Sequence, residues 1–379
     1  MPLRSFRTEP GAPEPGLSRR AFALGSLSLL AGVGLTACGE TGTTATSDTG
    51  TPPATTAPAT GTTASAAPSA APGSAAPASS AAPAADTFPV TITHKLGTTT
   101  IPAEPKRIVS VGLTEQDFLL ALGIVPVADT DWYGGQPNAI WPWAKPALGD
   151  AAPPQMLTDA DGIQYLEIAK LKPDLILGLN AGMDEKSYAQ ATKIAPTIGA
   201  PASGKQEYFD AWPLYLQVIG QAVGKSAQAA ELTTQLQQRF KDAAAANPEF
   251  AGKKAIFIQG AVSDGNFYAY EKGLGTEFLT DLGFDIPAEL DQYVPAEGGQ
   301  ALVPAERIDV FDSADYLIWA TESDEDEAAL KALPGFSDLK AVKAGKSVYT
   351  GAILSGAIYF STPLSLPYVL DHLIPLLKG

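Results

Sequence analysis

The sequence predicts an α/β protein in which two Rossmann-like βα lobes are joined by a single long α-helix, with a ligand cleft between the lobes. Segment 226–246 contains no Gly or Pro, and its apolar residues recur every three or four positions, as they do on one face of a helix. The chain on either side of this segment repeats one order of elements around the blocks 118–123 (FLLALG) and 278–283 (FLTDLG). Agreement in order as well as type favours duplication over a chance similarity between two ordinary α/β domains.

Composition and these repeats divide the 379 residues into five segments. We expect a signal peptide at 1–38, a tether at 39–86, an N-terminal lobe at 87–225, the connecting helix at 226–247 and a C-terminal lobe at 248–379. The net charge of −16 and the sequence pI of about 4.5 argue against nucleic acid as a partner, because phosphate binding needs a basic face. The single cysteine, Cys38, excludes an intramolecular disulfide.

The first segment has the features of a bacterial export signal. Arg19 and Arg20 form a twin-arginine pair, and the apolar run 21–35 that follows is too short to span a membrane comfortably. The run leads to Leu-Thr-Ala-Cys ending at Cys38, which resembles a bacterial lipobox. This resemblance implies export by the twin-arginine route and a lipid on Cys38 that anchors the protein to the outer face of the cytoplasmic membrane. The alternative is a plain signal peptide with a coincidental cysteine.

Segment 39–86 consists almost entirely of Thr, Ala, Pro, Ser and Gly, so it cannot bury a core and is predicted to be disordered. As a coil it would reach roughly 40 Å, which suits a tether between a membrane and a folded domain. A glycosylated stalk is the alternative that the same composition allows.

Both lobes show strand and helix patterns in alternation, with strands as short apolar or alternating runs and helices that end at Gly or before Pro. In the first lobe, we expect strands at 90–94, 108–111, 125–128 and 174–177, helices at 114–123 and 163–171, and a loop rich in Pro and Trp at 136–148. In the second lobe, we expect strands at 255–259, 315–319 and 347–350, and helices at 275–283, from 303 onward and after 367. The acidic run 324–327 is expected to be a solvated loop or the start of a helix.

Three segments, 105–111 (PKRIVSV), 121–127 (ALGIVPV) and 166–177 (LEIAKLKPDLIL), resemble the periplasmic-binding-protein family that serves ABC transporters of iron-siderophore complexes, haem and cobalamin. The resemblance extends from about Thr87 to the C-terminus. It implies a monomer that captures a small-molecule iron chelate between the lobes and delivers it to an ABC transporter permease. Because a continuous helix restricts hinge motion, we expect only a small closure around the ligand.

Catalysis has little support in the sequence, so no catalytic residue is assigned and the protein is not expected to be an enzyme. Its two histidines, His94 and His372, lie far apart in the chain, and no nucleophile elbow, P-loop or zinc-protease motif is present. A bare Zn or Mn site normally needs several histidines with carboxylates, so no metal site is assigned. We expect no bound cofactor, and a ferric siderophore would be the transported ligand.

Aromatic residues supply the best candidates for ligand contacts. A bulky organic chelate has an apolar rim and an oxygen-rich centre, which suits a cleft lined by aromatic rings. The alternative for each ring is that it pins a loop to the core. The candidates are Trp132, Tyr133 and Trp143 in the first lobe and Tyr268, Tyr270, Tyr293 and Trp319 in the second.

Few arginines are available to hold an anionic ligand. Beyond the export signal, the arginines are Arg107, Arg239 and Arg307. In the resembled family, arginines often clamp anionic ferric catecholates or carboxylates. We therefore favour a neutral or cationic ligand, such as a ferric hydroxamate. Lysines that could supply the missing charge are Lys145, Lys205 and Lys272.

Glu167 and Glu306 hold corresponding places near a helix start in the two halves. In the resembled family, an acidic residue on each lobe docks against arginines of the permease, and these two glutamates match those positions. Charge pairs of this type steer association and fix its register. The alternative is that both are ordinary solvated surface residues.

The sequence therefore predicts a lipid-anchored solute-binding protein that delivers an iron-siderophore complex, with the hydroxamate type favoured, to an ABC importer. Haem or cobalamin is the alternative ligand in the same role. A different class of alternative is a surface lipoprotein that binds protein or cell-wall components without serving transport. An enzyme is the third and least supported reading.

Overall fold

The computed structural model describes residues 86–379, apart from residues 207, 274 and 297. These residues belong to one compact unit. The predicted signal peptide, the lipidation of Cys38 and the tether up to residue 85 lie outside the described residues. Within the part that is described, no helix is both long enough and apolar enough to cross a membrane.

The N-terminal lobe contains a five-stranded parallel sheet with the strand order β5-β4-β3-β6-β7. The central strand β3 is fully buried, and helical connections link successive strands, as in a Rossmann-like lobe. A hairpin of β1 and β2 forms a separate antiparallel pair. The strands are β1 Val90–His94, β2 Gly97–Ile101, β3 Ile108–Ser110, β4 Ala128–Asp131, β5 Gln155–Thr158, β6 Leu175–Leu177 and β7 Thr197–Ile198. The α-helices are α1 Glu115–Ala121, α2 Lys145–Leu148, α3 Tyr165–Leu171, α4 Glu185–Ala191 and α5 Trp212–Ala222.

The predicted strand at 125–128 is wrong by three residues. The structure places β4 at Ala128–Asp131, so two carboxylates, Asp129 and Asp131, belong to a strand. Asp129 is completely buried. A search for apolar strands misses this one, because carboxylates are depleted in strands and are rarely buried.

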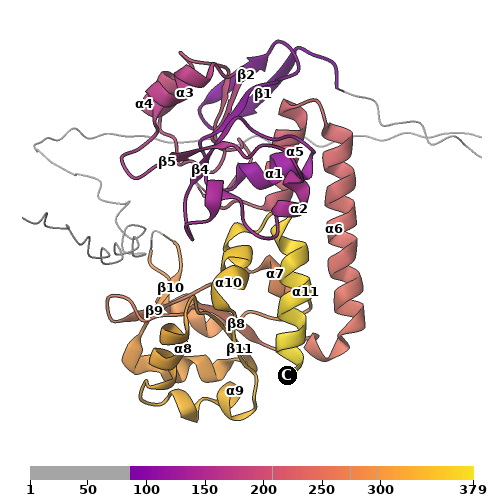
Figure 1. Cartoon of the computed structure of the whole chain (residues 1–379). Coiled ribbons are helices and arrows are strands. Elements are labelled where there is room, and N and C mark those ends of the chain that lie inside the picture. Colours follow the sequence, from indigo (N-terminus) through magenta and orange to yellow (C-terminus); the bar gives the residue numbers. More distant parts are fainter. Residues whose placement is uncertain (1–85, 207, 274, 297) are drawn as a thin grey trace, which may run out of the picture. The chain divides into compact units, whose positions relative to one another are not determined.

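A single helix, α6 (Ser226–Ala246), connects the two lobes, as the periodicity predicted. At 1.5 Å per residue it is roughly 30 Å long. Ala229 packs into the core of the N-terminal lobe, whereas Leu236 and Phe240 pack into the core that includes the last two helices of the chain. Figure 1 shows α6 running beside both lobes, with α5 and α11 packed against it. One rigid element therefore belongs to both cores.

The C-terminal lobe contains a mixed five-stranded sheet of order β10-β9-β8-β11-β12, in which β9 and β10 are antiparallel. The helix predicted from 303 onward is wrong at its start, because residues 301–304 alternate between buried and half-buried positions and pair with β9 as a strand. The strands are β8 Ala255–Gln259, β9 Asn266–Ala269, β10 Ala301–Pro304, β11 Tyr316–Ala320 and β12 Ser347–Tyr349. The α-helices are α7 Glu277–Thr280, α8 Asp324–Lys331 and α9 Lys340–Lys343, followed by α10 and α11, and the 3₁₀ helices are η3 Pro248–Phe250, η4 Ala288–Tyr293, η5 Ala305–Ser313 and η6 Phe336–Asp338.

The acidic run 324–327 forms the first turn of α8. The hydroxyl of Ser323 accepts a hydrogen bond from the backbone N–H of Asp326 at 3.1 Å, which caps the helix. Carboxylates are stabilised there because the amino end of a helix carries partial positive charge. Of the two expectations for this run, the helix start is confirmed.

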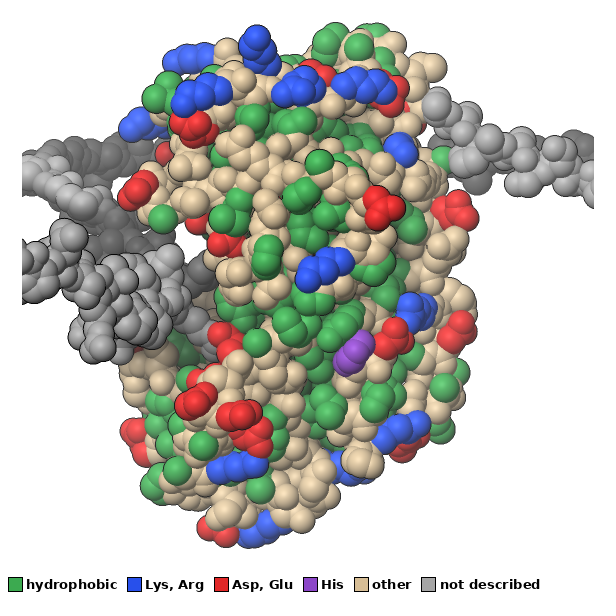
Figure 2. All heavy atoms as spheres, viewed as in Figure 1, with side chains coloured by type: hydrophobic (Ala, Val, Ile, Leu, Met, Phe, Trp, Pro, Cys, Tyr) green, Lys and Arg blue, Asp and Glu red, His purple; other side chains and the backbone are tan. Residues whose placement is uncertain are grey.

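Helices α10 (Gly351–Phe360) and α11 (Ser365–Lys378) end the chain and carry much of the contact between the lobes. One continuous core combines Trp141 and Trp143 of the N-terminal lobe with Phe360 and Leu366 of these helices. In Figure 1, α10 and α11 extend from the C-terminal lobe towards α1 and α2. Figure 2 shows apolar side chains gathered over this region. The two lobes therefore meet at a buried apolar junction.

Candidate ligand-binding site

The N-terminal lobe presents two aromatic rings at the carboxyl end of β4. Trp132 and Tyr133 directly follow Asp131, the last residue of that strand. Ligands of parallel α/β sheets bind at this edge. Both rings are half-buried, and the centroid of the Trp132 ring lies 4.9 Å from that of Phe209. Each ring therefore keeps part of its surface exposed at the edge where a ligand is expected.

The C-terminal lobe brings further rings to the same place. Tyr359 on α10 lies 5.8 Å from Tyr133 and 6.3 Å from Tyr270, measured between ring centroids. Tyr270 directly follows β9. We call the half-buried residues Trp132, Tyr133, Phe209, Tyr270 and Tyr359 the aromatic band. Ring contacts connect the band across the junction between the lobes, so both lobes contribute rings to it.

Sequence reasoning missed two members of the aromatic band. Phe209 reaches the band because its backbone N–H donates a hydrogen bond of 2.8 Å to Oδ1 of Asn180, which is buried beyond the carboxyl end of β6. Tyr359 belongs to the apolar run of α10, in which no pattern separates the half-buried position from its buried neighbours. The only feature of the sequence that could have pointed to Phe209 is the polar residue Asn180, which lies just beyond a strand end.

Behind the aromatic band stands a column of stacked rings. Trp143 and Trp141 stack with ring centroids 4.6 Å apart and an interplanar angle of 14°. Trp141 stacks in turn on Tyr133 at 5.6 Å and 25°. Trp141 and Trp143 are both buried. The structure therefore places Trp143 in a supporting position behind Tyr133, and not at the exposed surface that its prediction as a ligand contact assumed.

The three remaining aromatic candidates are not members of the aromatic band, and they differ in burial. Tyr268 is half-buried on β9 and, two residues before Tyr270, lies on the same face of that strand. Tyr293 packs against the core of the C-terminal lobe. Trp319 is completely buried in β11, and its Nε1 donates to the Ser347 hydroxyl oxygen at 3.0 Å. Burial removes Trp319 from the set of residues that can touch a ligand.

Acidic residues, and not arginines, adjoin the aromatic band. Asp131 precedes Trp132, Asp210 follows Phe209, and Glu271 follows Tyr270. Burial raises the pKa of Asp131, and the nearby charge of Asp159 raises it further.

The three arginines of the described part are engaged elsewhere. Arg107 donates to the carbonyl oxygen of Leu171 at 2.6 Å, at the end of α3. Arg239 on α6 pairs with Asp371 at 2.6 Å, and Arg307 pairs with Asp309 at 2.9 Å.

Two fully buried carboxylates lie near the site, Asp117 on α1 beside the column of rings and Asp129 on β4. Oδ2 of Asp117 accepts hydrogen bonds from Trp143 Nε1 at 2.8 Å and from the Thr362 hydroxyl at 2.6 Å. Burial raises the pKa of Asp117 to about 6, although these two hydrogen bonds act to lower it. Burial raises the pKa of Asp129 to about 8, and the charges of Asp117 and Asp131 add to the shift. Sequence reasoning missed both residues.

The two glutamates proposed to dock against a permease lie at the protein surface. Glu167 is in the first turn of α3 and pairs with Lys170 at 2.6 Å. Beside it, Leu166 is 80% exposed. Glu306 is exposed in the first turn of η5.

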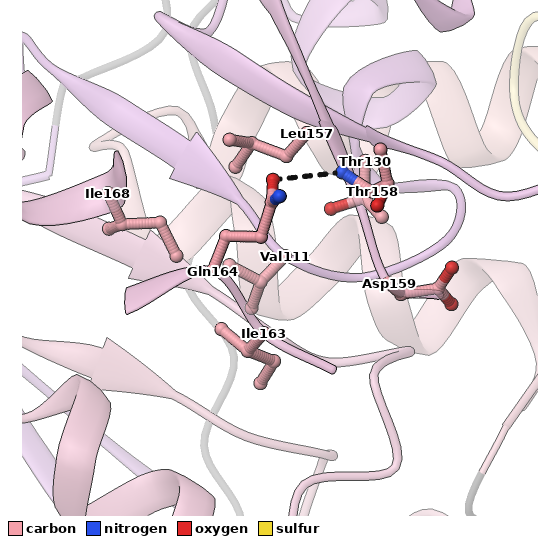
Figure 3. A pocket seen from close by; sticks show the side chains of 8 residues that line it. All are labelled: Val111, Thr130, Leu157, Thr158, Asp159, Ile163, Gln164 and Ile168. Carbon is pink, nitrogen blue, oxygen red and sulfur yellow. Dashed lines mark hydrogen bonds between the residues drawn. The ribbon is translucent and has the colours of Figure 1, made fainter. Parts of the chain in front are cut away.

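Two hollows lie away from the aromatic band. One, between β4, β5 and α3, has a volume of about 10 Å³, which is room for about one water molecule. Figure 3 shows its lining, where Gln164 accepts a hydrogen bond from the backbone N–H of Thr158. The other, of about 360 Å³, is an open polar surface beside Arg307 and Lys340. Among the residues that the structure describes, no group of three or more His, Cys, Asp and Glu side chains could hold a metal ion.

Comparisons with known proteins agree with this architecture. A family model described as periplasmic binding protein matches residues 108–354. A crystal structure of a periplasmic solute binding protein from Mycobacterium smegmatis is 43% identical, covers 76% of this chain and 97% of that one, and superposes with a TM-score of 0.70. The structure of PiaA from Streptococcus pneumoniae in complex with ferrichrome is 24% identical, covers 76% and 97% of the two chains with a TM-score of 0.65, and shows the similarity of fold.

Among curated proteins, the probable siderophore-binding lipoprotein YfiY of Bacillus subtilis is 31% identical over 199 residues, which is 52% of this chain and 57% of that protein. The match spans less than two thirds of the length of the curated relatives. The family model, by contrast, covers most of both lobes, from β3 to α10. The chain therefore belongs to the periplasmic binding protein family, a family of binding proteins and not of enzymes.

Proposed function

We propose that the protein captures a ferric siderophore outside the cytoplasm and delivers it to an ABC importer. The aromatic band carries this proposal, because rings from both lobes converge at the carboxyl end of β4 and are only half-buried. Such a surface suits a bulky chelate with an apolar rim. The names of relatives support the same ligand class, since one is a probable siderophore-binding lipoprotein and a solved relative holds ferrichrome.

The charge around the aromatic band favours a neutral or cationic chelate, such as a ferric hydroxamate. Asp131, Asp210 and Glu271 adjoin its rings. The arginines pair elsewhere, with Asp371, with Asp309 and with a backbone carbonyl group. A highly anionic ferric catecholate would meet like charge without a guanidinium partner, which disfavours its binding.

Delivery would use the half-buried Glu167 and the exposed Glu306 as charged contacts for arginines of the permease. Rim charges of this kind accelerate association and set the orientation of the complex. A lipid on Cys38 would keep the protein at the outer face of the membrane, and the segment 39–86 would let it reach the permease.

The test is a tryptophan-fluorescence titration of the full-length protein in detergent against ferrichrome, ferric enterobactin, ferric dicitrate, haem and cobalamin. We expect saturable quenching by ferrichrome at micromolar or tighter affinity. Preference for ferric enterobactin would retain the transport role and refute the charge argument. Preference for haem or cobalamin would replace the ligand class, and failure of all five to bind would refute the proposed function.

A matched pair of variants tests the position of the site. Tyr359→Ala removes a ring from the aromatic band, whereas Tyr349→Ala removes a half-buried tyrosine from β12, where its ring faces Lys331. We expect Tyr359→Ala to weaken ferrichrome binding by about tenfold or more, in line with the loss of an aromatic contact, and Tyr349→Ala to leave it unchanged. Equal effects of the two changes would show that the ligand binds elsewhere.

A further inference from the structure

One oxygen atom of Asp117 receives hydrogen bonds from both lobes. Trp143, which donates to Oδ2 from Nε1, belongs to the N-terminal lobe, and Thr362, which donates from its hydroxyl, lies between α10 and α11. Asp117 and Thr362 are completely buried and Trp143 nearly so. Among the described residues, Oδ1 of Asp117 has no hydrogen-bond partner. A buried carboxylate depends strongly on the donors that remain, so both bonds matter to it.

The hydroxyl of Thr362 is oriented towards Asp117 by a second set of hydrogen bonds. Its oxygen accepts from the backbone N–H of Ser365 at 3.0 Å, and its own backbone N–H donates to the Ser365 hydroxyl oxygen at 2.9 Å. A hydroxyl has one proton to donate, and here that proton goes to Asp117. The start of α11 is therefore tied directly to α1 of the other lobe.

Trp143 links Asp117 to the aromatic band through a series of stacked rings. It stacks on Trp141, and Trp141 stacks on Tyr133, which is a member of the band. At its edge, the Trp141 ring lies so close to Gly356 of α10 that a methyl group there would come within 2.5 Å of it. The ring column is therefore confined between α1 and α10.

We infer that Asp117 is a positioning residue of the ligand site, which through Trp143 orients the ring column ending at Tyr133 and through Thr362 fixes the C-terminal helices against that column. Its effect on ligand affinity rests on the proposed function, whereas the connection between the lobes does not. Asp117 itself lies behind the rings and does not contact a ligand.

This role predicts a specific kinetic signature. If the ring column samples several orientations, only the competent fraction binds, and the apparent dissociation constant rises by the inverse of that fraction. Once the ligand is bound, its contacts with the band are intact. Loss of the Asp117 hydrogen bonds should therefore slow association much more than it speeds dissociation. A residue that touches the ligand would act mainly on dissociation.

Conservative variants separate the hydrogen bonds from general destabilisation. Thr362→Val removes the donor to Asp117 and keeps the shape of the side chain, and Thr362→Ser should restore it. Because both hydrogen bonds end on one oxygen, the amide oxygen of Asp117→Asn can accept both, whereas Asp117→Ala accepts neither. Thr197→Val is the matched control, since Thr197 is equally buried but donates to Ala195 within its own lobe.

The experiment measures two properties of the full-length protein in detergent: the near-UV circular dichroism of the stacked tryptophans and stopped-flow association with ferrichrome. We expect Thr362→Val and Asp117→Ala to weaken the dichroism and to slow association about tenfold, with dissociation changed by less than about twofold. Thr362→Ser and Asp117→Asn should recover both properties, and Thr197→Val should alter neither.

The inference is overturned if Thr362→Val retains the wild-type dichroism, or if it changes dissociation in place of association. Thr362→Val provides this test even if Asp117→Ala does not fold. If the unaltered protein binds no ferrichrome, the proposed function fails on that evidence. The dichroism of the Thr362 variants then decides separately whether Asp117 holds the ring column.

Discussion

Gly356 lies on α10 where this helix passes the ring of Trp141. A methyl group at this position would come within 2.5 Å of Trp141 Cη2, a distance that requires one of the two to move. Trp141 is 1% exposed and is stacked between Trp143 and Tyr133, so its ring has little room to yield. We therefore expect Gly356→Ala to lower the free energy of unfolding, although alanine normally stabilises a helix relative to glycine.

The expected magnitude combines two opposing effects. Replacing glycine by alanine inside a helix contributes about 1 kcal/mol to stability. Forcing an extra methyl group into a packed core costs about 1–3 kcal/mol. The net effect is a loss of up to about 2 kcal/mol. In a Trp141→Leu background the clashing ring atoms are gone, so the same substitution should stabilise the protein by about 1 kcal/mol.

Urea unfolding of the four proteins, followed by far-UV circular dichroism, gives the double-mutant cycle. We expect a coupling free energy of about 1–3 kcal/mol between positions 356 and 141, with a change of sign between the two backgrounds. Equal stabilisation by Gly356→Ala in both backgrounds would refute the reasoning, because it would mean that α10 does not press against the ring column.

Three further predictions concern pH, surface charge and delivery. Raising the pH from about 5 to about 9 should lower the free energy of unfolding, because Asp129 keeps its proton up to about pH 8 in the folded protein but loses it near its ordinary, lower pKa when unfolded. Asp129→Asn should make the free energy of unfolding, measured with urea, depend less on pH. An unchanged pH dependence would contradict the raised pKa of Asp129. Arg239→Met, which breaks the exposed ion pair with Asp371, should change stability by less than about 1 kcal/mol in the same assay, and a larger loss would show that the pair fixes α6 against α11. Charge reversal at Glu167 and Glu306 should abolish ferrichrome uptake by cells while the affinity of the purified protein is unchanged; loss of affinity as well would place these glutamates in the ligand site.

Patterns of apolar residues predicted the elements whose buried positions are apolar. The connecting helix α6 and the buried strands β3, β8 and β11 were found because their apolar residues repeat or run together. The predictions failed at β4, which carries two carboxylates. They also failed at β10, which ends in a proline before a 3₁₀ helix. At both places tertiary packing overrides the local preference of the residues.

The candidate site was predicted in part. Trp132, Tyr133 and Tyr270 stand at strand ends, a position that sequence reasoning can recognise, and the structure brings them together. Trp319 also comes from a strand, but both faces of β11 are covered and all of its residues are buried, so the side chain cannot reach a ligand. Tyr359 has no such position in the sequence, since its exposure depends on how α10 crosses to the other lobe.

The sequence by itself determined the two-lobed α/β class, the connecting helix, the scarcity of arginine and the family resemblance, because each of these depends on neighbouring residues or on composition. The tertiary structure alone decided which rings share the aromatic band and which carboxylate joins the lobes. Asp117 and Thr362 are 245 positions apart and leave no local pattern. They meet because burying the apolar faces of α10 and α11 requires the N-terminal lobe, and that packing brings the hydroxyl to the carboxylate.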